Sequence, residues 1–300
     1  MKFLVFTLSF VGGACFFPWF AEAREAGLTV APVFQEVSFE AEEESVEFFI
    51  TLSNDTDGPL VLRPSVVDFG SLDESGGVAF LGATDNLVRK YALASWMRPE
   101  KDVISLASGE SEQLRVVIEN RESLSPGGHY GAVLFQVGNE ENTVDANAVA
   151  VNQLLSVLVF AKKQGGEVYG LKLLDYTLEK SWVRGISQAR LRFQNEGNVH
   201  AVPRGTVVLR DPVGRIVQKG IINTESGLVL PETQRTFVTK FVSVALLLVP
   251  GSYTLALEYR YDGKESVDQV QGTLFLVPWP SIALVLVSIL LLIGWWRKKK

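Results

Sequence analysis

Apolar and polar residues alternate with a period near two through most of residues 28–277. The alternation is clearest in segments rich in β-branched and aromatic residues, at residues 45–52, 113–118, 188–193, 205–209 and 252–259. Gly, Pro, Asn and Asp punctuate the gaps between them. This pattern predicts an all-β protein of short strands, as in a sandwich or barrel. Before residue 277, only residues 87–97 fit a short helix.

A pattern of strand and turn residues occurs twice along the chain. In each copy a strand ends at an asparagine, Asn54 or Asn195, and is followed by a turn and a Pro-containing strand. Each copy closes with Pro-Gly, one or two further residues, and Tyr. The repeat predicts two tandem immunoglobulin-like β-sandwiches, at residues 28–163 and 168–276, joined by a linker at residues 164–167.

The Pro-Gly-x-Tyr segments predict corners at the start of a strong strand. Proline fixes φ at the corner, and glycine permits the positive φ beyond it. The tyrosine that follows is expected to bury its ring and to bond its hydroxyl to nearby backbone. The predicted corner residues are Pro126, Gly127 and Tyr130 in the first copy and Pro250, Gly251 and Tyr253 in the second.

The C-terminus predicts one transmembrane helix. Residues 277–296 carry no charge, and 20 residues make a helix of about 30 Å, the thickness of a bilayer core. Trp279 stands at one end and Trp295 and Trp296 at the other, where interfacial aromatic residues belong. The basic residues 297–300 predict a cytoplasmic tail, with the rest of the chain outside the cell. A buried core helix with a basic tail is the alternative.

The N-terminus predicts a secretory signal peptide at residues 1–23. Lys2 provides the positive charge, residues 3–20 the apolar region, and Ala21 and Ala23 the small-x-small cleavage site. An uncleaved anchor helix is the alternative, although Gly12, Gly13 and Pro18 interrupt it. The residues around Cys15 do not fit lipidation, so the cleaved chain would contain no cysteine.

Composition and charge agree with a globular region between two apolar ends. The mean hydropathy is +0.18, and the apolar excess lies at the two termini. Of the net charge of −6, residues 297–300 contribute +4, Lys2 +1 and Glu22 −1, which leaves −10 for the rest. A polytopic membrane protein and a disordered protein are excluded. An acidic ectodomain also disfavours nucleic acid as a partner.

No catalytic or metal-binding motif stands out. One cysteine and two histidines exclude a disulfide framework and most His/Cys metal sites. His129 and His200 are expected at the surface or at corners. A calcium loop starting at Ser53 would need a carboxylate where Pro64 stands. The sequence therefore predicts a non-enzymatic protein with no catalytic residue, metal or cofactor.

Residues 69–102 form the least regular stretch of the first copy and are the candidate binding element. They include Tyr91, Trp96 and Arg98, and exposed aromatic residues beside arginine would suit contact with a glycan or peptide. The alternative is that the two aromatic rings cover the open edge of the sandwich, since large aromatic residues are usually buried.

Short strand and turn segments in both copies carry a resemblance to a known family. In the first copy these segments are Ser108-Gly109-Glu110, Leu114-Arg115-Val116 and residues 126–133. In the second they are residues 193–200, Pro203-Arg204-Gly205 and Val229-Leu230-Pro231. In these segments the chain resembles the bacterial WxL-interacting surface proteins. The resemblance implies a first domain that binds peptidoglycan and a second that binds another surface protein. It carries over no ligand-contacting residue.

These observations predict a single-pass cell-membrane protein whose ectodomain binds peptidoglycan, another cell-surface protein, or both. A second hypothesis is an extracytoplasmic, chaperone-like assembly factor that binds client strands at a sandwich edge. An unpaired edge strand with alternating pockets would favour this second hypothesis.

Overall fold

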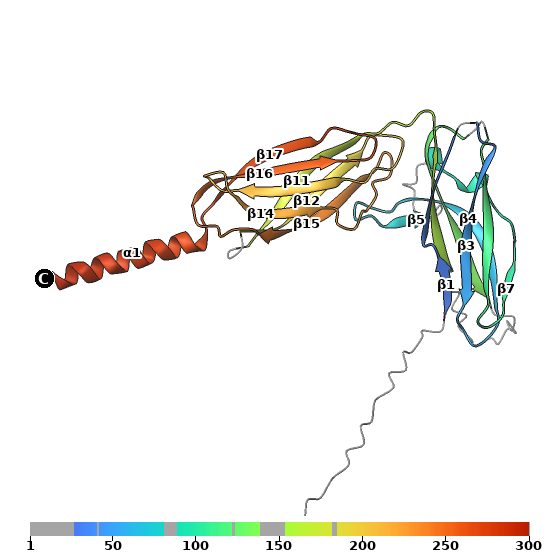
Figure 1. Cartoon of the computed structure of the whole chain (residues 1–300), viewed down its shortest axis with the longest axis horizontal. Helices are drawn as coiled ribbons and strands as arrows, with labels where there is room; N and C mark the ends of the chain where they lie inside the picture. Colours follow the sequence, from blue (N-terminus) through green and yellow to red (C-terminus); the bar gives the residue numbers. More distant parts are fainter. Residues whose placement is uncertain are drawn as a thin grey trace, which may run out of the picture.

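The structure, a computed structural model, describes residues 27–40, 42–80, 89–121, 124–138, 154–181 and 185–299. These residues form two β-sandwiches followed by one C-terminal helix (Figure 1). The prediction of an all-β chain with two immunoglobulin-like sandwiches and one C-terminal helix is confirmed. The predicted signal peptide lies outside the described residues and stays a prediction.

The first sandwich packs two sheets around one core. One sheet has the order β1 (Leu28–Ala31), β3 (Ser45–Asn54), β8 (Ser111–Glu119), β6 (Met97–Pro99). The other has the order β2 (Phe34–Phe39), β10 (Leu154–Lys163), β9 (Gly127–Gly138), β4 (Leu60–Ser71), β5 (Val78–Phe80), and β7 (Ile104–Leu106) also pairs with β4. On β8 the alternate residues Leu114, Val116 and Ile118 are buried in this core, as a period of two requires.

The second sandwich begins at residue 171, and residues 164–170 connect it to β10. The predicted domain bounds, with the linker at residues 164–167, stay a prediction. One of its faces is β11 (Leu171–Ser181), β12 (Gly185–Asn195) and β15 (Gln234–Ser243). The other is β14 (Ile216–Ile222), β13 (Arg204–Arg210), β16 (Gly251–Arg260) and β17 (Asp268–Leu276). β15 joins the two faces, because its last residues leave β12 and pair with β14.

The two repeated asparagines hold equivalent turns, and both are fully buried. The Asn54 side chain donates to the carbonyl of Gly58 and accepts from the backbone N–H of Thr56. The Asn195 side chain makes the same two bonds: it donates to the carbonyl of Val199, four residues on, and accepts from the backbone N–H of Gly197, two residues on. Since the buried amide satisfies several backbone groups at once, the repeat seen in the sequence is a repeat of structure.

The two Pro-Gly corners differ in the distance from proline to tyrosine, which is four positions in the first corner and three in the second. Gly127 and Gly251 both have positive φ, 119° and 149°. The Tyr253 hydroxyl donates to the carbonyl of Val249, four residues earlier, at 2.7 Å. In the first sandwich His129 stands in that position, with its Nε2 2.8 Å from the carbonyl of Ser125, also four residues earlier.

Tyr130 is expected from the sequence to bond nearby backbone, as Tyr253 does. Because His129 takes that position, the Tyr130 side chain points away from the first core. Its neighbour His129 points inward, and successive side chains of a strand point to opposite faces. The Tyr130 hydroxyl instead lies 3.4 Å from Nδ1 of His200 in the second sandwich.

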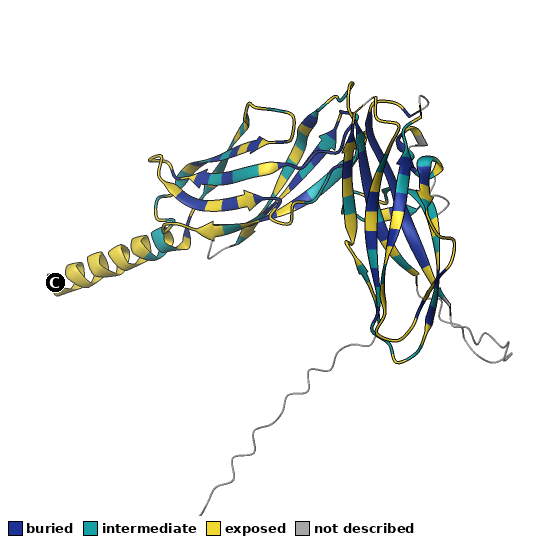
Figure 2. Ribbon diagram, turned by 45° about the vertical axis from the view of Figure 1, so that its right-hand side comes forward, coloured by how far each residue is buried: buried dark blue, intermediate teal, exposed yellow. Residues whose placement is uncertain are grey.

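The apolar C-terminal segment is the helix α1 (Trp279–Lys298), two residues later than predicted at each end. Pro278 is its N-cap, and Arg297 and Lys298 lie in its last turn. None of its residues is buried, and it is long and apolar enough to span a membrane (Figure 2). The short helix expected at residues 87–97 is two 3-10 turns, η1 (Arg89–Tyr91) and η2 (Ala94–Trp96), followed by β6.

We predict that Asn195→Ala destabilises the second sandwich by about 1–3 kcal/mol, because it leaves buried carbonyl and N–H groups without partners. Urea denaturation of the full chain in detergent micelles measures the change. The control Gln271→Ala, at an exposed position of β17, should cost less than about 0.5 kcal/mol. Equal effects of the two substitutions would contradict the prediction.

Candidate functional site

The two sandwiches meet through a group of side chains that we call the interdomain cluster. From the outer face of β9, β10 and β4 come Tyr130, Ala132, Leu134, Phe160 and Phe69, with Tyr91 from η1. Leu228 and Leu230 of the second sandwich pack against them. Because the inner faces of the same strands form the first core, this sheet is covered on both sides.

The rings of the interdomain cluster pack edge to face. The ring centroids of Phe69 and Phe160 are 5.3 Å apart, and those of Tyr130 and Phe160 are 5.8 Å apart. His200 of the second sandwich completes the group, 5.5 Å from Phe160. Such arrangements contribute about 0.5–1.5 kcal/mol per pair beyond the buried area.

His200 links the cluster to a carboxylate of the first sandwich. Its Nε2 lies 3.3 Å from Oε1 of Glu36, while its Nδ1 faces the Tyr130 hydroxyl. A hydrogen bond from His200 holds the pKa of Glu36 below its usual range, and burial raises that of Tyr130. Neither histidine lies at the surface, since His200 is 9% exposed and His129 2% exposed, and His129 occupies the first corner.

Glu232 makes a second polar contact across the boundary. Its carboxylate accepts hydrogen bonds from the Tyr91 hydroxyl at 2.9 Å and from Nζ of Lys90 at 3.1 Å. The hydrogen bond from Tyr91, with that from Lys90, lowers the pKa of Glu232.

The backbone at Glu232 has a positive φ of 59°, and Gly109 stands at the equivalent turn of the first sandwich with a φ of 75°. The N–H of each donates to the carbonyl of the repeated asparagine, Asn54 or Asn195. A side chain in this conformation is unfavourable, so the contacts of the Glu232 carboxylate offset a strained backbone.

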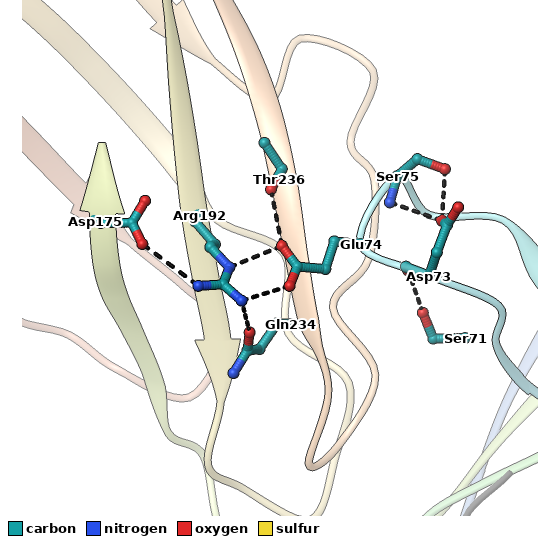
Figure 3. Close-up of polar contacts among 8 residues, drawn as sticks. All are labelled: Ser71, Asp73, Glu74, Ser75, Asp175, Arg192, Gln234 and Thr236. Atoms are coloured by element: carbon teal, nitrogen blue, oxygen red, sulfur yellow. Dashed lines mark hydrogen bonds and ion pairs between the residues drawn. The ribbon is translucent and has the colours of Figure 1, made fainter. Parts of the chain in front are cut away.

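The β4–β5 hairpin reaches the second sandwich at a third point (Figure 3). The Glu74 carboxylate accepts two hydrogen bonds from the Arg192 guanidinium of β12, at 2.7 and 2.5 Å. The Glu74 carbonyl also accepts from the backbone N–H of Thr236 on β15 at 2.7 Å. Arg192 holds the pKa of Glu74 below its usual range. This paired geometry fixes the direction of the hairpin as well as its distance.

Asn198 joins the first corner, the linker and the second sandwich. Its backbone carbonyl accepts from the N–H of Gly128 at 2.8 Å. Its side chain donates to the carbonyl of Gly166 and accepts from the N–H of Val168. A Cβ on Gly127 would lie 2.9 Å from the Asn198 amide nitrogen, so glycine is needed there for close approach as well as for its φ.

Together these contacts hold the two sandwiches at an angle to each other, so that the described part of the chain is bent (Figures 1 and 2). One cavity between the sandwiches, lined by residues such as Phe160, Leu228 and Arg235, has a volume of about 140 Å³. Sites for small molecules usually measure about 300–1,000 Å³. The contacts between the sandwiches thus form a packed joint.

The three residues of the candidate binding element do not gather on one surface. Tyr91 is buried in the interdomain cluster, and Trp96 is half-buried with its ring 6.2 Å from that of His129. Arg98 is exposed and donates to the carbonyl of Met97. Tyr91 is therefore occupied by the second sandwich, and a binding role for this element stays a prediction.

The segment around η1 and η2 closes one edge of the first sandwich. Leu93 and Met97 are fully buried in the first core. The Asp68 carboxylate accepts from the N–H groups of Leu93 and Ala94 at 2.7 and 2.6 Å. Gly131 makes room for them, because a Cβ there would lie 2.6 Å from the Met97 methyl group.

The opposite edge of the first sandwich is open within the described residues. β2 pairs with β10 from Leu158 to Lys163, so the first four residues of β10, Leu154 to Val157, have no partner on that side. The N–H of Leu158 donates to the carbonyl of Val33 at 3.1 Å. Because alternate N–H groups of a strand point to the same side, those of Ser156 and Leu154 face the open edge. We call Leu154–Val157 and the facing strand β1 the open edge.

No family model matches the sequence, and a search of curated proteins finds no match. Solved structures match over most of the chain. A structure of the chaperone-tip adhesin complex of CFA/I fimbriae biogenesis is 10% identical with a TM-score of 0.46, covering 84% of this chain and 100% of that chain. The class 5 fimbriae chaperone CfaA is 10% identical with a TM-score of 0.42, covering 84% and 100%. The Salmonella enterica SafA pilin in complex with the SafB chaperone is 10% identical with a TM-score of 0.40, covering 82% and 97%.

Among the described residues no group of three or more His, Cys, Asp or Glu side chains could hold a metal ion.

We did not predict from the sequence that His200, Glu232 and Glu74 make contacts between the two sandwiches. The available signal was on β9, where the consecutive residues Ala132 to Phe135 are all apolar, as in a strand buried on both faces.

We predict that the double variant Glu74→Ala/Glu232→Gly loosens the joint between the sandwiches without unfolding either one. Glycine suits the positive φ at position 232, so the folded turn is retained. Spin labels on Val103→Cys and Val267→Cys, in a Cys15→Ala background, should show a broader distance distribution. Glu265→Ala, at an exposed site, is the control, and an unchanged distribution in the double variant would contradict the prediction.

We predict that mild acid destabilises the first sandwich through His129. Burial holds the pKa of His129 below its ordinary value of 6.5, despite the nearby carbonyls of Ser125 and Ala92. The unfolded chain therefore binds a proton that the folded chain does not, and the free energy of unfolding falls as the pH drops from about 7 towards about 5.

Urea denaturation at several pH values measures this slope, followed by the fluorescence of Trp96 in a background in which the other five tryptophans are replaced by phenylalanine. His129→Gln should be less stable than the natural chain at pH 7 but should lose most of the slope. A slope that persists unchanged in the variant would refute the role of His129.

Proposed function

We propose that this chain is a non-enzymatic, membrane-anchored binding protein that takes up an extended segment of another protein at the open edge. The observation that supports this is that, among the described residues, Leu154–Val157 of β10 pair with β9 on one side and with no strand on the other. Exposed N–H and C=O groups of an edge strand are a ready template for a further strand. The binding mode is β-strand addition, the second of the two hypotheses from the sequence.

The core beneath the open edge is incompletely covered. Leu28 and Val30 of β1 and Leu155 of β10 face the first core but are only partly buried. Nearby, Val33 and Leu154 are 68% and 55% exposed. A partner strand with apolar residues at alternate positions would bury these side chains, and full burial of one such side chain contributes about 1.5–3 kcal/mol.

The two edges of the first sandwich differ among the described residues, and we place the partner at the open one. The segment around η1 and η2 fills the edge near Leu93 and Met97. We propose that the joint between the sandwiches holds the open edge at a fixed position relative to the second sandwich. We propose that α1 anchors the chain in the cell membrane, with both sandwiches outside and residues 297–300 in the cytoplasm. Peptidoglycan binding, implied by the resemblance to the WxL-interacting proteins, stays a prediction.

The test uses the full chain in detergent micelles and a library of twelve-residue peptides with alternating apolar and polar residues, alongside scrambled peptides of equal composition. We expect the alternating peptides to bind and the scrambled ones to bind at least ten-fold more weakly, which corresponds to about 1.4 kcal/mol. Ser156→Pro should abolish binding, because it removes an N–H group that faces the open edge while proline is tolerated at such an edge position.

Ser156→Ala keeps the N–H group and is the matched control, so it should bind as well as the natural chain. Retention on purified peptidoglycan is measured in parallel. Peptide binding that survives Ser156→Pro, or retention on peptidoglycan with no binding of any peptide, would reject strand addition at the open edge.

A further inference from the structure

The end of the second sandwich beside α1 is formed by two turns and the start of the helix. Residues 211–215 join β13 to β14, and residues 244–250 join β15 to β16. The turns lie close together, since a Cβ on Gly251 would be 2.9 Å from the Pro212 ring. Leu246 lines the same depression of about 490 Å³ as Pro278 and Trp279. We call this part of the molecule the helix-proximal end.

Large apolar side chains are exposed at the helix-proximal end. Leu246 is 74% exposed and Val213 66% exposed, at the tips of the two turns. Further exposed apolar side chains in the half of the second sandwich next to α1 are Val242, Val244, Leu248, Phe275 and Val277. At the opposite end, the turns Asn223-Thr224-Glu225-Ser226 and Asp262-Gly263-Lys264 are polar. Exposed apolar groups concentrated at one end mark a surface that something else covers.

The charges of the helix-proximal half have the opposite sign to those of the whole ectodomain. Among its described residues the basic ones are Lys180, Arg190, Arg210, Arg215, Lys219 and Lys240, against the acidic Glu179 and Asp211. Both acidic groups are already in ion pairs, Glu179 with Arg190 and Asp211 with Arg215. The remaining basic groups are available to an anionic surface in an otherwise acidic ectodomain.

The length of α1 sets the level of the bilayer surface. Its 20 residues span about 30 Å, so the hydrocarbon core ends close to Trp279 at one end and close to Trp295 at the other. Tryptophan belongs to the interfacial layer between hydrocarbon and water. Leu246 lies beside Trp279 in the shared depression, and the turn at residues 244–250 is therefore at the same depth.

We propose that the helix-proximal end docks onto the phospholipid bilayer in which α1 sits. Val213, Leu246 and Leu248 insert into the interfacial layer, and Lys180 and Arg210 contact lipid phosphate groups. The combination of apolar tips and surrounding basic side chains is what an interfacial contact with anionic lipid requires. The second sandwich is then seated on the membrane as well as tethered to it.

The test places an environment-sensitive fluorophore on single cysteines of the full chain, in a Cys15→Ala background, reconstituted into vesicles of phosphatidylcholine with or without phosphatidylglycerol. At Leu246→Cys we expect a blue-shifted emission and quenching by lipid-borne nitroxides several-fold above that at Ile221→Cys. Ile221 is the matched control, because it is 57% exposed on the same sandwich but lies in the other half. Phosphatidylglycerol should strengthen the quenching, and Lys180→Gln/Arg210→Gln should remove that increase.

A label at Leu290→Cys, within α1, must be quenched if the helix is in the bilayer. Equal quenching at positions 246 and 221, or none at 290, overturns the proposal. Quenching at 246 that disappears when the protein is diluted to one chain per vesicle overturns it as well, since a second copy of the chain would then be the covering partner. None of these outcomes depends on peptide binding at the open edge, so the two proposals can fail separately.

Discussion

The alternation of side chains along β9 determines how the two halves of the molecule meet. Tyr130, Ala132 and Leu134 face the interdomain cluster, while Val133 and Phe135 face the first core. A shift of one residue in the pairing of β9 would exchange these two sets and remove the tyrosine ring from the boundary. The corner at Gly127 fixes the register at which the strand starts, so one turn controls both the first core and its contact with the second sandwich.

The sequence was sufficient to predict the strands and the repeat, because both depend on local patterns. Buried asparagines at Asn54 and Asn195 hold their turns through groups two and four residues away, and such spacings are visible in a single chain. The register at the first corner was not determined in this way. The Pro-Gly motif does not tell whether Tyr130 or its neighbour His129 points to the first core, and the pairing of β9 with β10 decides this.

The contacts between the sandwiches could not be predicted, because they join residues far apart in the sequence, 70 positions for Tyr130 and His200 and 118 for Glu74 and Arg192. In the sequence, Glu74 and Arg192 cannot be distinguished from other solvated charges. Their contact depends on where the β4–β5 hairpin lies relative to the second sandwich. For the candidate binding element, Tyr91 is buried, as the covering alternative supposed, and its partner is the second sandwich. The open edge was foreseen as a discriminating feature, but its position on β10 depends on where β2 stops pairing.

The join between β17 and α1 has a mechanical consequence. Two residues, Val277 and Pro278, separate the last strand from the helix, and α1 continues in the long direction of the second sandwich (Figure 1). A force that pulls α1 away from the sandwiches therefore acts along β17. Because hydrogen bonds of an antiparallel pair lie across the strands, such a force shears the whole β16–β17 ladder, from Gly251–Leu276 to Tyr259–Asp268, at once. Shear distributes the load over all these pairs, which makes the last strand a strong attachment between the second sandwich and the helix.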